Sequence, residues 1–273
     1  MIDAHQHFWK YHPERDAWIN EDMKVIQRDF LPHDLKPLYD QFGIEGCVAV
    51  QADQSEAETH FLLSLADQHD FILGVVGWVD LRADNLTERL DYFSQYKKLK
   101  GFRHIVQGEP RGFLTDQKFL GGVHKLRDFN FTYDLLIYHH QLEEALPFAH
   151  QVRDVRIVVD HLAKPSIKTK EKTRWELNMA AFATFENVFC KISGMVTEAD
   201  WKDWKKEDFT PYLDELFEVF GPERLMYGSD WPVCLLAASY EQQLSIIQQY
   251  IAPLSDREKQ LIGSENARKF YNL

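Results

Sequence analysis

The chain has 273 residues, a length that suits one large domain with a substantial core. Its net charge of −12 argues against a nucleic-acid or membrane-surface binder, because such proteins present basic patches. The three cysteines are widely spaced and odd in number, so they indicate no disulfide framework. No apolar run approaches the roughly 18 residues that span a membrane, and the start of the chain lacks the features of a secretory signal. We therefore expect a cytoplasmic protein.

Eight short apolar runs alternate with amphipathic stretches along the chain. The runs are rich in Val, Ile and Phe and show no polar alternation, which is typical of parallel strands buried on both faces. The first predicted strand opens the chain and ends in His5 and His7, and the other seven cover residues 46–52, 72–79, 100–105, 131–138, 156–161, 188–194 and 225–230.

The stretches between these runs have helical spacing of apolar residues. They predict helices over residues 34–42, 55–68, 85–96, 116–129, 142–152, 174–185, 211–220 and 240–251, with Asp84 as the N-cap of the third and a final helix over 256–270. Eight strand–helix units predict an α/β fold, a (β/α)₈ TIM barrel formed by residues 1–273 as a single domain. The alternative is an open doubly wound sheet, although no glycine-rich phosphate turn follows the first strand.

Two predicted loops are too long to be simple connectors. Residues 8–33 and 195–210 both follow strand ends, where barrel enzymes build their sites, and both are rich in aromatic residues. These rings either stack on a sugar-like ligand or anchor their loops to the barrel. They are Phe8, Trp9, Tyr11, Trp18, Trp201, Trp204 and Phe209.

His5 and His7 are the first candidate site residues. Alternate side chains of a strand point to the same face, so these two imidazoles project side by side, on the face of Asp3. Two such groups at a buried strand end are costly unless they have partners or a function.

His161 and Asp230 end two later strands. If Val159 and Met226 line the barrel interior, strand alternation also turns His161 and Asp230 inward. Asp160 is the alternative to His161 if the register differs by one residue.

These four residues suit either of two chemistries. Imidazole and carboxylate groups are ligands of Zn²⁺, so His5, His7, His161 and Asp230 predict a site for one divalent metal ion. The same set works without metal if Asp230 deprotonates a water while the histidines hold that water or polarise a carbonyl.

Four longer strings strengthen this interpretation. They are DFLPHDL (29–35), GFRHI (101–105), DHLAKP (160–165) and YGSDWP (227–232). Together with His-x-His on the first strand, they resemble the amidohydrolase superfamily over essentially the whole chain. The resemblance is to its amidohydrolase-2 and sugar-lactonase branch, which includes L-fuconolactonases and L-rhamnonolactonases of carbohydrate metabolism.

The resemblance implies roles for individual residues. Asp230 matches the general base, and His5, His7 and His161 match residues around the hydrolytic water or a single metal ion. The carboxylated lysine of binuclear members is absent, since Arg103 and His104 stand at that strand end. The implied ion is therefore one zinc-like cation at most, and the enzyme is expected to be able to work without it.

Substrate-pocket candidates also lie at the predicted strand ends. They are Gln51, Trp78, Arg103, His104 and Trp231. A buried ion pair with Asp134 or Asp160 is the alternative for Arg103. Lys164 receives no role, and His139 and His140 are assigned either to the site rim or to a loop.

The expected activity is hydrolytic opening of a sugar-acid lactone to the aldonate. The alternatives are a zinc-dependent amidohydrolase or decarboxylase on the same barrel, a lactonase for an aromatic-derived dicarboxylate, and a non-catalytic barrel. Too few arginines reach the site for two carboxylates, which disfavours the dicarboxylate. The expected partner is a small sugar lactone, with no nucleic acid or membrane, and a homo-oligomer is compatible with the sequence.

Overall fold

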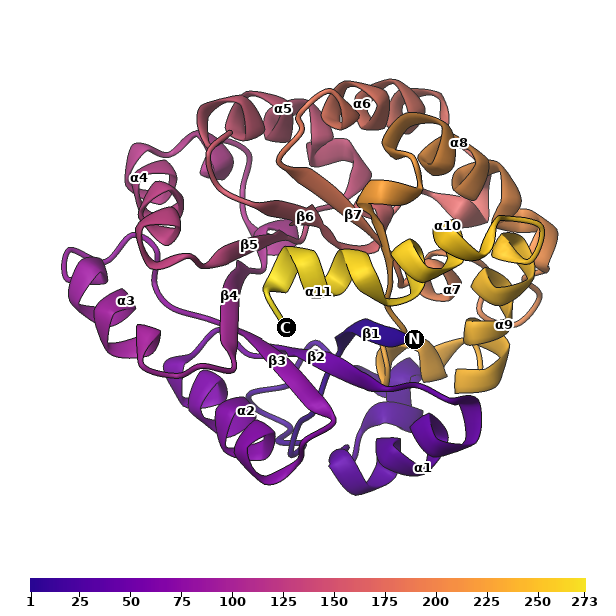
Figure 1. Cartoon of the computed structure of the whole chain (residues 1–273), viewed down its shortest axis with the longest axis horizontal. Coiled ribbons are helices and arrows are strands. Elements are labelled where there is room, and N and C mark those ends of the chain that lie inside the picture. Colours follow the sequence, from indigo (N-terminus) through magenta and orange to yellow (C-terminus); the bar gives the residue numbers. More distant parts are fainter.

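The computed structural model describes residues 1–273, which form one parallel sheet of eight strands in sequence order (Figure 1). An isolated bridge between Gln6 and Trp231, with a 2.7 Å hydrogen bond from the His7 amide to the Trp231 carbonyl, closes the sheet into a barrel. The predicted (β/α)₈ fold is confirmed. The strands are β1 (Ile2–Gln6), β2 (Gly46–Val50), β3 (Ile72–Gly77), β4 (Leu99–His104), β5 (Thr132–Leu135), β6 (Ile157–Val159), β7 (Val188–Ile192) and β8 (Leu225–Tyr227).

Helices surround the barrel, and every predicted helix is present. Asp84 is not an N-cap: α3 begins after Asn85, whose side chain makes no capping hydrogen bond. No helix has the length and apolar character needed to cross a membrane. The helices are α1 (Pro32–Phe42), α2 (Glu56–Gln68), α3 (Leu86–Ser94), α4 (Gln117–Lys125), α5 (Leu142–Gln151), α6 (Thr173–Ala183), α7 (Met195–Glu198), α8 (Thr210–Phe220), α9 (Tyr240–Ile251), α10 (Asp256–Gln260) and α11 (Asn266–Tyr271), with a π-helical turn over Leu261–Glu265.

The strands end earlier than the apolar runs predict. β6 stops at Val159 and β8 at Tyr227, because the next residues leave the extended conformation. His161 and Asp230 therefore lie on irregular segments beyond the strands, where the backbone is free to direct them toward the barrel axis.

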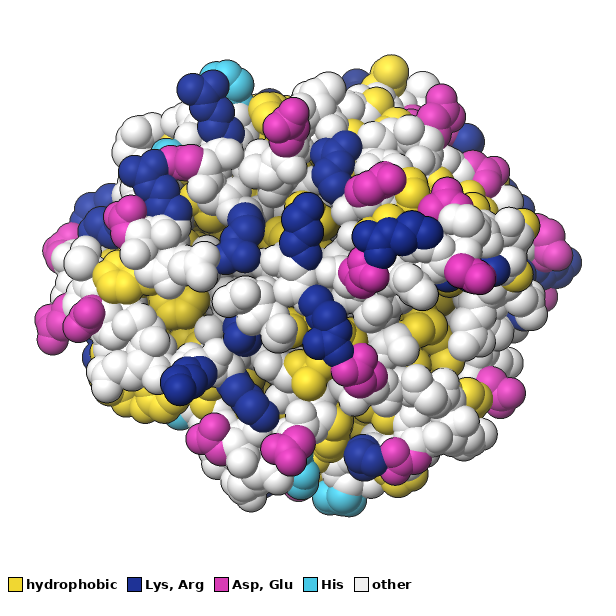
Figure 2. All heavy atoms as spheres, viewed as in Figure 1, with side chains coloured by type: hydrophobic (Ala, Val, Ile, Leu, Met, Phe, Trp, Pro, Cys, Tyr) yellow, Lys and Arg dark blue, Asp and Glu magenta, His cyan; other side chains and the backbone are white.

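Helix α11 closes one end of the barrel, and both chain termini lie near it (Figure 1). Its Ala267, Phe270 and Tyr271 join an apolar cluster with interior strand residues such as Val48 and Val158. On the same face, Lys and Arg gather over the middle, while most Asp and Glu lie nearer the edge (Figure 2). Two basic side chains hold the C-terminal end of the chain: Lys100 Nζ donates to the Asn272 carbonyl (2.8 Å) and Arg156 donates to the Phe270 carbonyl (2.6 Å). The opposite end, at the strand C-termini, is the mouth.

A layer of buried charged side chains lies between helix α11 and the mouth of the barrel. Lys191 Nζ is 2.5 Å from Asp134 Oδ2 and 3.0 Å from Asp160 Oδ1, and all three side chains are fully buried. Tyr271 of α11 donates to the same Asp134 oxygen (2.7 Å). Each buried charge thus has a partner of opposite sign, which such charges require.

Replacing Tyr271 by Phe removes the hydroxyl that donates to buried Asp134. We expect Tyr271→Phe to lower the free energy of unfolding by about 2 kcal/mol, because a buried charged acceptor loses a donor. Tyr250→Phe is the matched control, since Tyr250 donates to exposed Asp214 (2.7 Å), and it should change stability by less than about 0.5 kcal/mol. Urea unfolding measures both. Equal effects of the two variants would contradict a structural role for the buried bond.

Candidate active site

The two histidines of β1 meet at the barrel mouth. His5 Nε2 lies 3.2 Å from His7 Nε2. The pairing of β1 with β2 shifts register after Asp3, and the Asp3 carboxylate accepts a hydrogen bond from Tyr39 of α1 (2.9 Å). The expectation that Asp3 shares the face of the histidines is therefore wrong, because this irregularity interrupts strand alternation.

His161 reaches the mouth by a route that alternation does not predict. Val158 belongs to the interior cluster, whereas Val159 packs in the core outside the strands. The expected inward face of Val159 is thus wrong, and Asp160 is the residue that continues inward. His161 enters because residues 161–164 all have left-handed backbone, with φ of 53°, 56°, 57° and 50°. Left-handed backbone costs non-glycine residues roughly 1–2 kcal/mol each.

Hydrogen bonds from two neighbouring elements hold this left-handed turn. Trp175 Nε1 donates to the Leu162 carbonyl (2.6 Å), and His139 Nδ1 donates to the Lys164 carbonyl (2.8 Å). His139 therefore supports the turn from outside the pocket. Strained backbone that is fixed from several sides is characteristic of functional sites.

Asp230 faces all three imidazoles. Its backbone is also left-handed (φ 56°), and its amide donates to the His5 carbonyl (2.8 Å). The Oδ1 atom lies 3.4 Å from His7 Nε2, 3.8 Å from His161 Nε2 and 3.9 Å from His5 Nε2. Burial would raise the pKa of Asp230, but the nearby His161 and His7 outweigh it and hold that pKa below its ordinary value. The carboxylate is therefore ionised at neutral pH.

Two of the imidazoles are neutral. Burial lowers the pKa of His161 to about 4, even though Asp230 and Asp160 oppose the shift. Burial also lowers the pKa of His5 well below its ordinary value. Imidazolium is therefore not available from these two residues as an oxyanion stabiliser at neutral pH.

The proton positions on the β1 histidines follow from their partners. His7 Nδ1 must carry a proton, because it donates to the Val50 carbonyl (2.8 Å). His5 Nδ1 faces both the Lys191 ammonium (3.1 Å) and the Asp160 carboxylate (3.3 Å). One tautomer of His5 accepts from Lys191 and donates through Nε2 to His7. In the other tautomer, the Nδ1 proton faces Asp160 and the Nε2 lone pair accepts from Arg103 Nη1 (3.3 Å).

The ion network below the site also holds Arg103. Arg103 Nη1 lies 3.1 Å from Asp160 Oδ2, and Nη2 donates to Gln51 Oε1 (3.2 Å) and to the Gln51 carbonyl. Burial opposes ionisation of Asp160, but Lys191 and His5 keep its pKa well below the ordinary value. The alternative of a buried Arg103 ion pair with Asp160 is thus present. Lys191 was not predicted as a functional residue, although it is the single Lys within the apolar run 188–194.

A pocket of about 230 Å³ opens above these groups. His7, His161 and Asp230 line its floor, and Trp9 and Trp18 of the loop after β1 line one wall. The two indoles meet edge to face at 6.1 Å. Of the aromatic residues predicted in the loop after β1, Trp9 and Trp18 therefore line the pocket.

Most of the predicted substrate-binding residues lie outside this pocket. Arg103 lines it, but Gln51, Trp78, His104 and Trp231 do not. Gln51 is buried against Arg103, and Trp78 Nε1 donates to His104 Nδ1 (3.3 Å). His104 turns outward because its neighbour on β4, Arg103, points inward. Trp231 is buried, in the core outside the strands.

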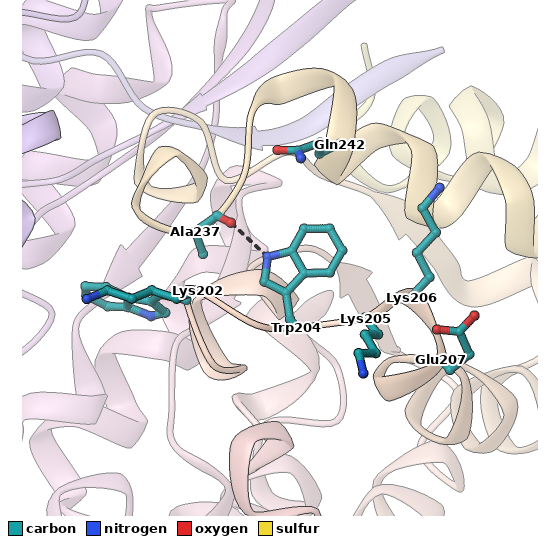
Figure 3. A pocket seen from close by; sticks show the side chains of 8 residues that line it. Lys202, Trp204, Lys205, Lys206, Glu207, Ala237 and Gln242 are labelled. Carbon is teal, nitrogen blue, oxygen red and sulfur yellow. Dashed lines mark hydrogen bonds between the residues drawn. The ribbon is translucent and has the colours of Figure 1, made fainter.

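The second aromatic loop lines a separate hollow of about 470 Å³ at the rim. Figure 3 shows Trp204 directed at the carbonyl of Ala237, to which its indole donates (2.8 Å). Trp201 likewise donates to the Thr197 carbonyl (2.9 Å), and Phe209 is fully buried. These rings anchor their loop to the barrel. The cluster of His5, His7, His161 and Asp230, called the His–Asp cluster below, does not line this hollow.

The His–Asp cluster fits one divalent metal ion. Ligands about 2.0–2.2 Å from a zinc ion lie at most about 4.3 Å apart. The distances of 3.4–3.9 Å from Asp230 Oδ1 to the imidazoles satisfy this limit, and His5, His161 and Asp230 form the one compact group of potential ligands.

A sequence model of the amidohydrolase family matches residues 2–273. The chain belongs to the amidohydrolase family. This amidohydrolase is 39% identical over 284 residues to an L-fucono-1,5-lactonase of Burkholderia multivorans, covering 100% of this chain and 96% of that protein. It is 34% identical over 241 residues to an L-fucono-1,5-lactonase of Burkholderia ambifaria, covering 88% and 82%. A crystal structure of a zinc-bound amidohydrolase from B. multivorans superposes with a TM-score of 0.96 at 39% identity, covering 100% and 99% of the two chains.

The lowered pKa of His161 predicts how the free energy of unfolding depends on pH. The folded protein favours neutral imidazole, so the contribution of His161 is complete above its unfolded pKa of about 6.5 and is lost as the pH falls toward about 4. The difference in unfolding free energy between the metal-free wild type and His161→Asn should therefore shrink by roughly 3 kcal/mol over this range. Urea unfolding at several pH values tests this. A difference that stays constant with pH would contradict the shift.

Proposed function

We propose that this amidohydrolase opens a sugar-acid lactone, of the L-fucono- or L-rhamnono-lactone type, to its aldonate. The observation that carries the proposal is the ionised Asp230 facing three imidazoles at the floor of a small pocket. Both Burkholderia relatives named L-fucono-1,5-lactonase align with this chain over most of its length. The indoles of Trp9 and Trp18 offer apolar surface for the C–H face of a sugar ring.

In the proposed mechanism, Asp230 is the general base. A water held between its carboxylate and the ring nitrogens of His7 and His161 gives a proton to Asp230 while its oxygen attacks the lactone carbonyl carbon. The bond from that carbon to the ring oxygen then breaks, and Asp230 returns the proton to the ring oxygen. The new carboxylic acid ionises and releases one proton to solvent, so one water is consumed for each aldonate formed.

His5, His7, His161 and Asp230 would hold a divalent ion such as zinc. When bound, such an ion supplies Lewis-acid polarisation and lowers the pKa of water. Without it, the imidazoles still have polar neighbours: His5 Nδ1 lies 3.1 Å from the Lys191 ammonium, and His5 Nε2 lies 3.2 Å from His7 Nε2. We propose that these side chains orient the water in either state.

A zinc-dependent amidohydrolase or decarboxylase is the second candidate. The fit of His5, His161 and Asp230 to a single ion favours it. Measuring zinc content, and activity before and after chelation, separates the two: lactone opening that survives chelation supports the first, and activity restored only by zinc supports the second.

We also propose a cytoplasmic location. All three cysteines are unpaired and buried, as is usual in reducing compartments. The proposed partner is a small-molecule lactone.

Asp230→Asn tests the proposed base. We expect kcat/KM for L-fucono-1,5-lactone to fall by about 100- to 10,000-fold, because the amide cannot take the proton from water. Turnover is followed by acid release with a pH indicator, over a panel of aldonolactones, with and without chelator. Near-native turnover by this variant would exclude the role of Asp230.

Asp200→Asn is the matched control. Asp200 is an exposed carboxylate after β7 that pairs with Lys168 (3.2 Å). It should leave turnover unchanged, so a comparable loss would show that Asp230→Asn acts through general damage. A wild-type protein that opens no lactone of the panel would overturn the proposed function.

A further inference from the structure

Lys164 is the cation at the pocket whose charged group forms no hydrogen bond. Lys164 and Arg103 are the two cationic residues that line the pocket. The Arg103 guanidinium is occupied by Asp160 and Gln51. The Lys164 ammonium forms no hydrogen bond, and its nearest acidic partner, Glu198 of α7, has its Oε1 atom 3.8 Å away. Three N–H donors therefore stay available at the pocket.

The backbone presents Lys164 together with His161. Lys164 ends the left-handed turn with φ of 50°, and its amide donates to the His161 carbonyl (2.6 Å). Its own carbonyl accepts from His139 (2.8 Å). Because the strained turn is fixed at both residues, His161 and Lys164 reach the same pocket from one rigid segment.

The surroundings of the Lys164 ammonium partly shield it from water. The Lys164 side chain is 18% exposed and Glu198 is 21% exposed. The Lys164 ammonium also lies 5.4 Å from the centre of the Tyr138 ring. A partly desolvated cation at this position interacts more strongly with an anion than an exposed lysine does.

Opening of a neutral lactone creates negative charge twice. The carbonyl oxygen becomes an oxyanion during attack, and the product is a carboxylate. The two Nη atoms of Arg103 are already engaged by Asp160 and Gln51. The Lys164 ammonium, which forms no hydrogen bond, is the other cationic group that lines the pocket and can donate to this charge.

We propose that Lys164 donates a hydrogen bond to the reacting carbonyl oxygen and then holds the product carboxylate, with Glu198 as its counter-ion in the free enzyme. This assignment rests on the proposed lactonase function. It makes Lys164 a catalytic residue and makes Glu198 a group that positions it.

Lys164→Met and Glu198→Gln test this division of roles. We expect Lys164→Met to lower kcat for L-fucono-1,5-lactone by about 100-fold, as loss of an oxyanion donor does. Glu198→Gln should stay within about threefold of wild type, because it removes only a weak ion pair. Lys168→Met is the matched control on the same segment, since Lys168 forms an exposed pair with Asp200, and it should have no effect. Equal losses in Lys164→Met and Glu198→Gln would indicate a purely structural pair and overturn the proposal.

The affinity for L-fuconate, measured by calorimetry, tests the role of Lys164 separately from the proposed lactonase function, because binding of the product requires no turnover. Lys164→Met should bind L-fuconate at least about tenfold more weakly than wild type, as expected for loss of a charged hydrogen bond. If the wild type opens no lactone, the proposed function fails, but this weakened binding would still support carboxylate recognition by Lys164. Equal binding by the two proteins, or no binding by the wild type, overturns the assignment.

Discussion

The ion pairs of Lys191 with Asp134 and Asp160 are the constraint on which the active site depends. All three side chains are fully buried inside the barrel, where an unpaired charge is strongly destabilising. Asp134 is tied below to Tyr271 of α11, and Asp160 is tied above to His5 and Arg103. The network therefore connects the helix that closes the barrel to the residues that would handle water.

The chemistry at the mouth follows from this arrangement. Asp160 compensates the positive charges of Lys191 and Arg103. Burial keeps His5 and His161 neutral, and Asp230 is the carboxylate that lines the pocket. Neutral imidazoles and one carboxylate suit both water activation and one divalent ion. Positive charge toward substrate is left to Lys164, at the far end of the left-handed turn.

The regular part of the molecule was predictable from the sequence, and the irregular part was only partly so. Repeated apolar runs and helical spacing predicted the barrel. His-x-His and Asp230 were predicted as site residues, and the structure brings their side chains together at the barrel mouth. Strand alternation gave the wrong inward residue on β6, because His161 depends on four consecutive left-handed residues, none of them glycine, that no local pattern signals. Alternation also gave the wrong face for Asp3, because the pairing of β1 with β2 shifts register there. Trp78 and His104 were predicted from their places at strand ends, and they do not line the pocket.

The central claim is that Asp160, supported by Lys191, holds His5 in its working position. The most direct test is kcat for L-fucono-1,5-lactone in Asp160→Asn compared with Asp134→Asn. Both variants remove a carboxylate partner of Lys191, but only Asp160 lies beside His5. The account predicts a loss of about 10- to 100-fold for Asp160→Asn, as for groups that orient catalytic histidines, with Asp134→Asn losing stability but little activity. Near-wild-type kcat in Asp160→Asn, or equal losses in both variants, would contradict it.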